Sequence, residues 1–174
     1  MEFKEGLLYE IYFDDNDSTD DFDVGFFVAK DEGYVVFQCV GRDGFVGGLL
    51  LAKIENIWNL QSDTIYCQSL NKLIKYHGTK FEKISFKAKN LKKEFLALAQ
   101  ETRAITGIEL RDSGSTDLFG FVENVSDDFV ITLEVSNDGY ADGNGQCRFN
   151  DITKIHMNAT RHRKYKILFD INSK

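Results

Sequence analysis

Short runs in which apolar and polar positions alternate, separated by turns, make up most of the chain. Residues 129–135 show this most clearly: Phe, Ile, Leu and Val alternate there with positions that include Thr132 and Glu134. A period of two predicts a β-strand with one buried face. We expect Thr132 and Glu134 to lie on the outward face of this strand.

The first third of the chain contains five such segments, rich in β-branched and aromatic residues and broken by Gly and Asp turns. We expect strands at residues 7–13, 24–29, 34–40, 45–54 and 56–60. Five short strands in so few residues favour a small β-barrel or sandwich over βαβ units.

The pattern changes to a helical period between residues 90 and 101. Asn90 precedes apolar residues spaced i, i+4, i+7 and i+8 from Leu91, which predicts a capped amphipathic helix. A shorter helix is expected over residues 69–76, ending near Gly78, with a counterpart at residues 164–169. Residues 80–86 also alternate, so they could be a strand or part of a linker.

The same unit occurs twice, at a fixed offset of 95 residues and without a gap over residues 25–60. Recurring elements are Gly25-Phe26 with Gly120-Phe121, Asp43-Gly44-Phe45 with Asp138-Gly139-Tyr140, Gly48 with Gly143, and Asn56-Ile57 and Leu60 with Asp151-Ile152 and Ile155. This duplication predicts two domains, residues 1–78 and 79–174.

These recurring residues resemble the Sm-like family. Similar short bacterial Sm-like proteins have an Asp-Gly-Phe/Tyr turn, a later Gly and an Asp/Asn-Ile closing segment. The resemblance implies a mainly β fold: two small five-stranded Sm-like open barrels in tandem, with a connecting α-helix before the second. Sm-like proteins often bind single-stranded RNA and assemble into rings. Asn56 and Asp151 precede Ile here, where the family's RNA-binding element has a basic residue before Gly or His, so RNA binding does not carry over.

Charge is distributed unevenly, although the net charge is only -7. Residues 1–63 contain 4 Lys/Arg and 14 Asp/Glu, whereas residues 64–105 contain 9 and 3. The acidic total disfavours a general phosphate-binding protein. The basic connector, defined by Lys80, Lys83, Lys87, Lys89, Lys92 and Lys93 with Phe81 and Phe86, could contact nucleic acid. Complementary charge between neighbouring elements or subunits is the plainer interpretation.

Differences between the two copies provide the functional hypothesis. Five positions that we take to be outward and polar in the second copy are apolar in the first. They are Phe37 for Thr132, Cys39 for Glu134, Leu49 for Asn144, Leu51 for Gln146 and Trp58 for Thr153. An apolar patch of this size is prone to associate. We therefore expect Phe37, Leu49, Leu51 and Trp58 to contact a partner protein, a second copy or a covering element.

Other candidate chemistry is weak. The acidic loop of residues 14–23, with six Asp, lacks the Gly and Glu of an EF-hand, so a solvated loop or a weak cation site are the alternatives. Cys39, Cys67 and Cys147 have no metal-binding spacing and suit small buried residues. His156 and His162 stand among basic residues, which suggests a surface position.

The sequence therefore predicts a non-enzymatic binding or assembly module that acts through protein contacts. RNA binding by the basic connector is the alternative. We expect no catalytic residues, cofactor, metal, small-molecule ligand or membrane span, and the cytoplasm as the compartment.

Overall fold

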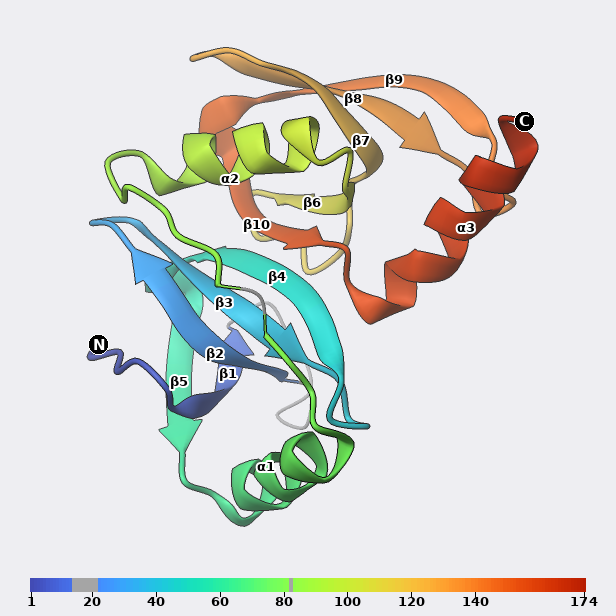
Figure 1. Ribbon diagram of the computed structural model, residues 1–174. Coiled ribbons are helices and arrows are strands. Elements are labelled where there is room, and N and C mark those ends of the chain that lie inside the picture. The colour runs from blue at the N-terminus through green and yellow to red at the C-terminus, as the bar shows by residue number, and fades with distance from the viewer. Residues whose placement is uncertain (14–21, 82) are drawn as a thin grey trace. The chain divides into compact units, whose positions relative to one another are not determined.

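A computed structural model describes residues 1–13, 22–81 and 83–174 of the chain. Within these residues the protein is mainly β, with ten strands and three α-helices, which confirms the mainly β prediction (Figure 1). The chain divides into two compact units, Met1–Leu91 and Lys92–Lys174.

The first unit contains five antiparallel strands followed by a helix. Its strands are β1 (Leu8–Phe13), β2 (Asp23–Lys30), β3 (Tyr34–Val40), β4 (Val46–Lys53) and β5 (Ile57–Ser62), with the short helix η1 (Ile54–Asn56) before β5 and helix α1 (Ile65–His77) after it. The strand order within this unit is β5-β1-β2-β3-β4. Strands therefore occur at all five of the predicted places.

The second unit repeats this order. Its elements are α2 (Leu91–Glu101), β6 (Ile105–Leu110), β7 (Leu118–Val125), β8 (Phe129–Val135), β9 (Ala141–Arg148), η2 (Phe149–Asp151), β10 (Ile152–Met157), η3 (Thr160–His162) and α3 (Arg163–Asn172). The antiparallel order within this unit is β10-β6-β7-β8-β9. The helix predicted from Leu91 is α2, and it precedes these strands.

Helix α1 begins and ends at residues suited to those positions. The Thr64 hydroxyl accepts a hydrogen bond from the Cys67 N–H at 3.1 Å, which satisfies one free amide of the first turn. Gly78 follows the helix at φ 61°, a left-handed conformation that favours glycine. The predicted end near Gly78 is confirmed, and α1 starts earlier than residue 69.

The division between the units falls later than the expected boundary at residues 78 and 79. The reason lies in the connector, which stays on the first unit. Thr79 donates a hydrogen bond to the Gly44 carbonyl at 2.9 Å, and the Phe81 ring packs edge-on against Phe26. The Leu91 N–H then donates to Asp31 at 2.8 Å.

The core of the first unit corrects one expectation about faces. Phe37 and Cys39 pack in the inner cluster with Tyr9 and Leu50, and Phe37 is fully buried. Phe37 is the register partner of Leu50 on β4, and paired residues share a face of the sheet. The prediction that Phe37 and Cys39 face outward is therefore wrong.

The second unit places polar groups at the matching inner positions. Thr132 is fully buried, and its hydroxyl donates to Glu134 and to the Gly145 carbonyl. Glu134 in turn accepts a hydrogen bond from the Phe119 N–H at 2.8 Å. Because these groups satisfy one another, they can face inward. The expected outward face of β8 is thus its more buried face.

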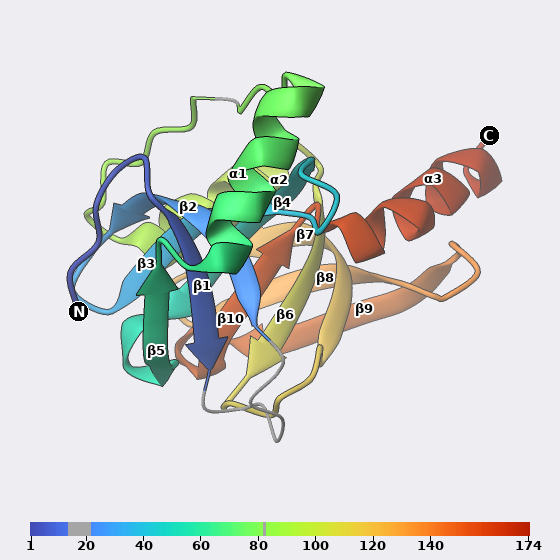
Figure 2. The same cartoon turned by 90° about the horizontal axis from the view of Figure 1, so that it is seen from below.

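One helix contact recurs in both units. Gly44, at φ 82°, lies at the β3–β4 turn, and a Cβ atom there would be 2.8 Å from the Leu73 Cβ of α1. Gly139, at φ 77°, lies at the β8–β9 turn, and a Cβ there would overlap the Leu168 Cβ of α3. Both helices are visible in Figure 2. In each unit, an Asp-Gly turn allows the following helix to approach the hairpin closely.

Candidate binding surfaces

Trp58 ends a row of four aromatic side chains in the first unit. Its ring centroid is 5.7 Å from that of Tyr12, Tyr12 is 5.1 Å from Phe22, and Phe22 is 5.4 Å from Tyr66. We call these four residues the aromatic row. Trp58 is 51% exposed and Tyr66 is 36% exposed. The row therefore presents ring surface to solvent from β1, β5 and α1.

A buried carboxylate, that of Glu10, is hydrogen-bonded to Tyr12 of the aromatic row. Glu10 is 5% exposed and accepts a hydrogen bond from the Tyr12 hydroxyl at 2.7 Å. Its other oxygen accepts from the Thr64 hydroxyl and from the Cys67 thiol at 3.7 Å. Thr64 and Cys67 thus hold the Glu10 carboxylate, and this carboxylate orients the Tyr12 hydroxyl. Burial raises the pKa of the Cys67 thiol and that of the Tyr66 hydroxyl, so both groups are neutral at pH 7.

Of the four residues expected to contact a partner, the structure leaves Trp58 on the surface. Phe37 lies in the inner core, and Leu49 and Leu51 are 5% and 0% exposed. Tyr12 and Phe22 lie between Trp58 and Tyr66 in the aromatic row. Comparing the two copies does not reveal Tyr12, Phe22 or Tyr66, because these residues lie outside the aligned residues 25–60.

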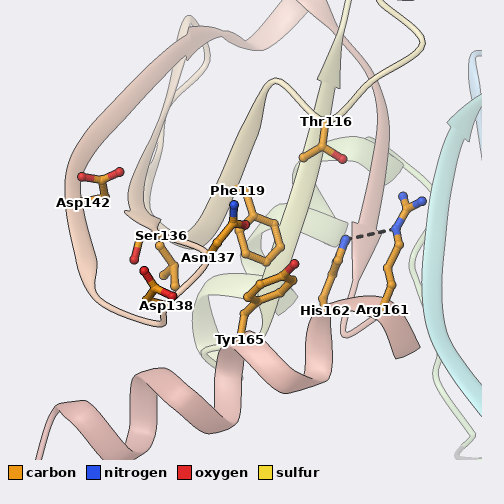
Figure 3. Close-up of a pocket in the computed structure, with 10 residues that line it drawn as sticks. Thr116, Phe119, Ser136, Asn137, Asp138, Asp142, Arg161, His162 and Tyr165 are labelled. Carbon is orange, nitrogen blue, oxygen red and sulfur yellow. Dashed lines mark hydrogen bonds between the residues drawn. The ribbon is translucent and has the colours of Figure 1, made fainter.

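The second unit has a groove of about 740 Å³ between α3 and the β8–β9 turn. Its lining includes Phe119, Asp138, Asp142, His162 and Tyr165, and we call it the α3 groove. Figure 3 shows Asp138 and Asp142 on one side and His162 on the other, with the rings of Phe119 and Tyr165 between them. The ring centroids of Phe119 and Tyr165 are 5.2 Å apart.

His162 is the buried ionisable group of this groove. It is 4% exposed, and its Nε2 accepts a hydrogen bond from the Arg161 Nε at 3.2 Å. Its Nδ1 is buried and has no hydrogen-bond partner among the described residues. Burial, with smaller contributions from the charges of Arg161 and His156, lowers the pKa of His162 to about 3. The ring is therefore neutral at pH 7, and because Nε2 accepts, its proton lies on Nδ1.

The expectation that His162 is a surface residue is therefore wrong. Basic neighbours suggested exposure, but η3 and α3 turn the ring toward Gly107, where an added Cβ would be 2.9 Å from the imidazole Cε1. The internal repeat does contain a signal that His162 is buried. His162 matches Cys67 at the offset of 95 residues, and Cys67 lies on the inner side of α1.

The three cysteines behave as structural residues. Cys39, Cys67 and Cys147 are free and buried, as predicted, and burial raises the pKa of Cys147 to about 11. Most of the acidic loop, residues 14–21, lies outside the described residues. In the described parts of the chain, no group of three or more His, Cys, Asp or Glu side chains is placed to hold a metal ion.

The basic connector uses several of its side chains internally. The buried Lys92 amine donates to the Phe149 carbonyl at 2.6 Å and lies 4.4 Å from the Phe149 ring centroid. Lys93 pairs with Asp127 at 2.6 Å, and the Phe81 ring packs on Phe26.

No helix within residues 1–13, 22–81 and 83–174 has the length and apolar character needed to cross a membrane. No protein-family model, curated protein or solved structure matches the chain.

Proposed function

We propose that this protein is a non-enzymatic binding module that acts through protein contacts, with the aromatic row of the first unit as its contact surface. The half-exposed ring of Trp58, which packs at a tilt against Tyr12 of that row, is the observation that supports this proposal. Trp and Tyr are enriched at the energetic centres of protein interfaces. Rings already held by neighbours lose little rotamer freedom on binding.

The charge of the first unit favours a basic partner segment. Residues 1–63 contain 4 Lys/Arg against 14 Asp/Glu, so a positively charged surface would be attracted to this part of the chain. Lys and Arg side chains also bind the faces of aromatic rings, and Trp is the strongest acceptor of such contacts. We therefore expect the partner to place Lys or Arg against the exposed rings of Trp58 and Tyr66.

The scaffold for this function is, in our proposal, a tandem duplication of a five-stranded Sm-like barrel. The same strand order in both units supports it, as do the matching glycine turns at Gly44 and Gly139. We also propose a cytoplasmic location, because three free, buried cysteines suit a reducing compartment.

RNA binding through the basic connector stays the alternative. The contacts made by Phe81, Lys92 and Lys93 leave fewer groups for stacking and phosphate binding, so they favour the protein-contact hypothesis.

Site-specific photocrosslinking in the native cell tests the proposal. A photoreactive phenylalanine analogue is placed at Tyr66, at one end of the aromatic row, with a matched probe at Phe129, an exposed aromatic residue of the second unit. We expect adducts with a protein from the Tyr66 position, through a segment rich in Lys or Arg, and loss of these adducts in a Trp58→Ala background.

Identical adducts from both positions, or adducts that persist without Trp58, would contradict the aromatic row as the contact surface. Adducts with nucleic acid alone, accompanied by a high 260/280 nm absorbance ratio in gently purified material, would favour the RNA alternative.

A further inference from the structure

The α3 groove occupies a place that is filled by apolar side chains in the first unit. There, Val24, Val40, Cys67 and Leu70 form one buried or nearly buried cluster beneath α1. At the offset of 95 residues the corresponding positions are Phe119, Val135, His162 and Tyr165, all of which line the groove. Phe119, Val135 and Tyr165 still pack in an apolar cluster in the second unit, so the polar groups that this copy adds are the His162 imidazole and the Tyr165 hydroxyl.

The replacement of Cys67 by His162 leaves a polar atom in need of a partner. The Cys67 thiol donates to the Leu8 carbonyl at 3.5 Å and to Glu10 at 3.7 Å. His162 Nδ1 has no such acceptor among the described residues. A buried N–H without an acceptor destabilises the fold, so its retention requires an explanation such as a ligand oxygen.

The opposite wall of the groove has the complementary chemistry. Asp138, in the β8–β9 turn, and Asp142, near the start of β9, are exposed carboxylates. The Phe119 and Tyr165 rings lie between these carboxylates and His162 (Figure 3). Carboxylates and ring faces both bind organic cations, and cation binding by a ring is strongest where water is partly excluded. A cation bound there would lie across the rings from His162.

We propose that the α3 groove binds a small organic ammonium compound that also has an oxygen acceptor, the chemical class that includes free amino acids and amino alcohols. The ammonium group pairs with Asp138 and Asp142 against the rings of Phe119 and Tyr165. The oxygen accepts the hydrogen bond from His162. Because Nδ1 is covered, binding shifts the imidazole or the side chains that cover it.

Three probes of equal size separate the two parts of this recognition. Ethanolamine has both groups, propylamine lacks the oxygen, and ethylene glycol lacks the ammonium. Each is titrated into the isotope-labelled full chain while amide and imidazole NMR signals are recorded. We expect saturable shifts at His162 and the β8–β9 turn with ethanolamine, and affinities at least about tenfold weaker for the two other probes.

A double variant, Asp138→Asn with Asp142→Asn, provides the matched test of the cation. Asn-Gly is as favourable as Asp-Gly in a tight hairpin turn, so the turn is expected to persist. We expect ethanolamine affinity to fall about tenfold or more in this variant and to be unchanged in Asp128→Asn, which removes an exposed carboxylate elsewhere in the unit. Wild-type affinity in the double variant, equal shifts with ethylene glycol, or no saturable shift with any probe would overturn the proposal.

Discussion

The neutral state of His162 makes the second unit sensitive to acid. In the folded protein the pKa of this ring is lowered from 6.5 to about 3, chiefly because the ring is buried. The unfolded chain binds a proton on this imidazole below about pH 6.5, whereas the folded chain does not until about pH 3. The stabilising effect is therefore complete above pH 6.5 and is lost as the pH falls toward 3.

The pKa shift sets the size of this effect. Each unit of difference in pKa corresponds to about 1.4 kcal/mol, so the contribution lost between about pH 7.5 and pH 5 is roughly 2 kcal/mol. The full limit, reached near the folded-state pKa, is roughly 5 kcal/mol. These figures apply without a large correction for solvent screening, because His162 is 4% exposed.

His162→Gln removes this titration while keeping a polar side chain. The variant is destabilised at neutral pH by its altered packing, but that loss is common to both pH values. We therefore expect the gap in unfolding free energy between wild type and variant to narrow by about 2 kcal/mol from pH 7.5 to pH 5. His77→Gln controls for the loss of an imidazole at an exposed position in the first unit.

The assay must report on the second unit, because the single tryptophan, Trp58, lies in the first. Hydrogen exchange of peptides from β6 and β10, measured by mass spectrometry across a urea series, gives the unfolding free energy of that unit in the intact chain. Parallel pH profiles for wild type and His162→Gln would refute the burial of a neutral imidazole.

Three further predictions follow from particular contacts. Phe37→Glu places a carboxylate in the inner core and is expected to lower the free energy of unfolding by at least about 4 kcal/mol, measured by denaturation followed by Trp58 fluorescence. Gln146→Glu, at an exposed position, should change this free energy by less than about 0.5 kcal/mol. Lys154→Met leaves the buried Glu109 without the amine that lies 3.3 Å away, and we expect the free energy of unfolding to fall by about 3–5 kcal/mol. Much of this loss should be recovered in the double variant with Glu109→Leu, and hydrogen exchange of β6 would report both changes. Gly139→Ala, at φ 77° beneath α3, should cost about 1–3 kcal/mol and increase hydrogen exchange in α3, and protection equal to wild type would contradict the contact.

Much of the secondary structure follows from local pattern. Alternation predicts a strand at residues 34–40, which is β3, and the cap at Thr64 and the left-handed Gly78 show why α1 begins and ends where it does. The end of the first compact unit at Leu91 does not follow from local pattern. It depends on where Phe81 and Leu91 make their contacts, and those contacts are with residues far away in the sequence.

Faces were harder to predict than strands. Alternation along β8 distinguishes two faces of the strand but does not show which face is buried. The hydrogen bonds that join Thr132, Glu134 and Gly145 explain why the polar face of β8 lies inward. Hydropathy assigns a polar residue to water, but a polar group whose hydrogen bonds are satisfied by its neighbours is tolerated in the interior. For the same reason Phe37, at the position of Thr132, was assigned to the wrong face.

The two copies therefore differ inside as well as outside. Where the first unit packs Phe37, Cys39 and Leu50 together, the second has Thr132, Glu134 and Gly145, and a Cβ at Gly145 would be 2.8 Å from the Thr132 hydroxyl. Each residue needs the others, because Gly145 leaves space for the hydroxyl and the carboxylate, and the Glu134 carboxylate accepts a hydrogen bond from the Thr132 hydroxyl. Exchange of one member alone would leave a clash or an unpaired group, whereas exchange of all three could restore an apolar core. The differences between the copies thus form sets of mutually dependent residues. Comparing single positions along the sequence therefore shows that one copy is apolar where the other is polar, but it does not show whether those positions lie in the core or on the surface.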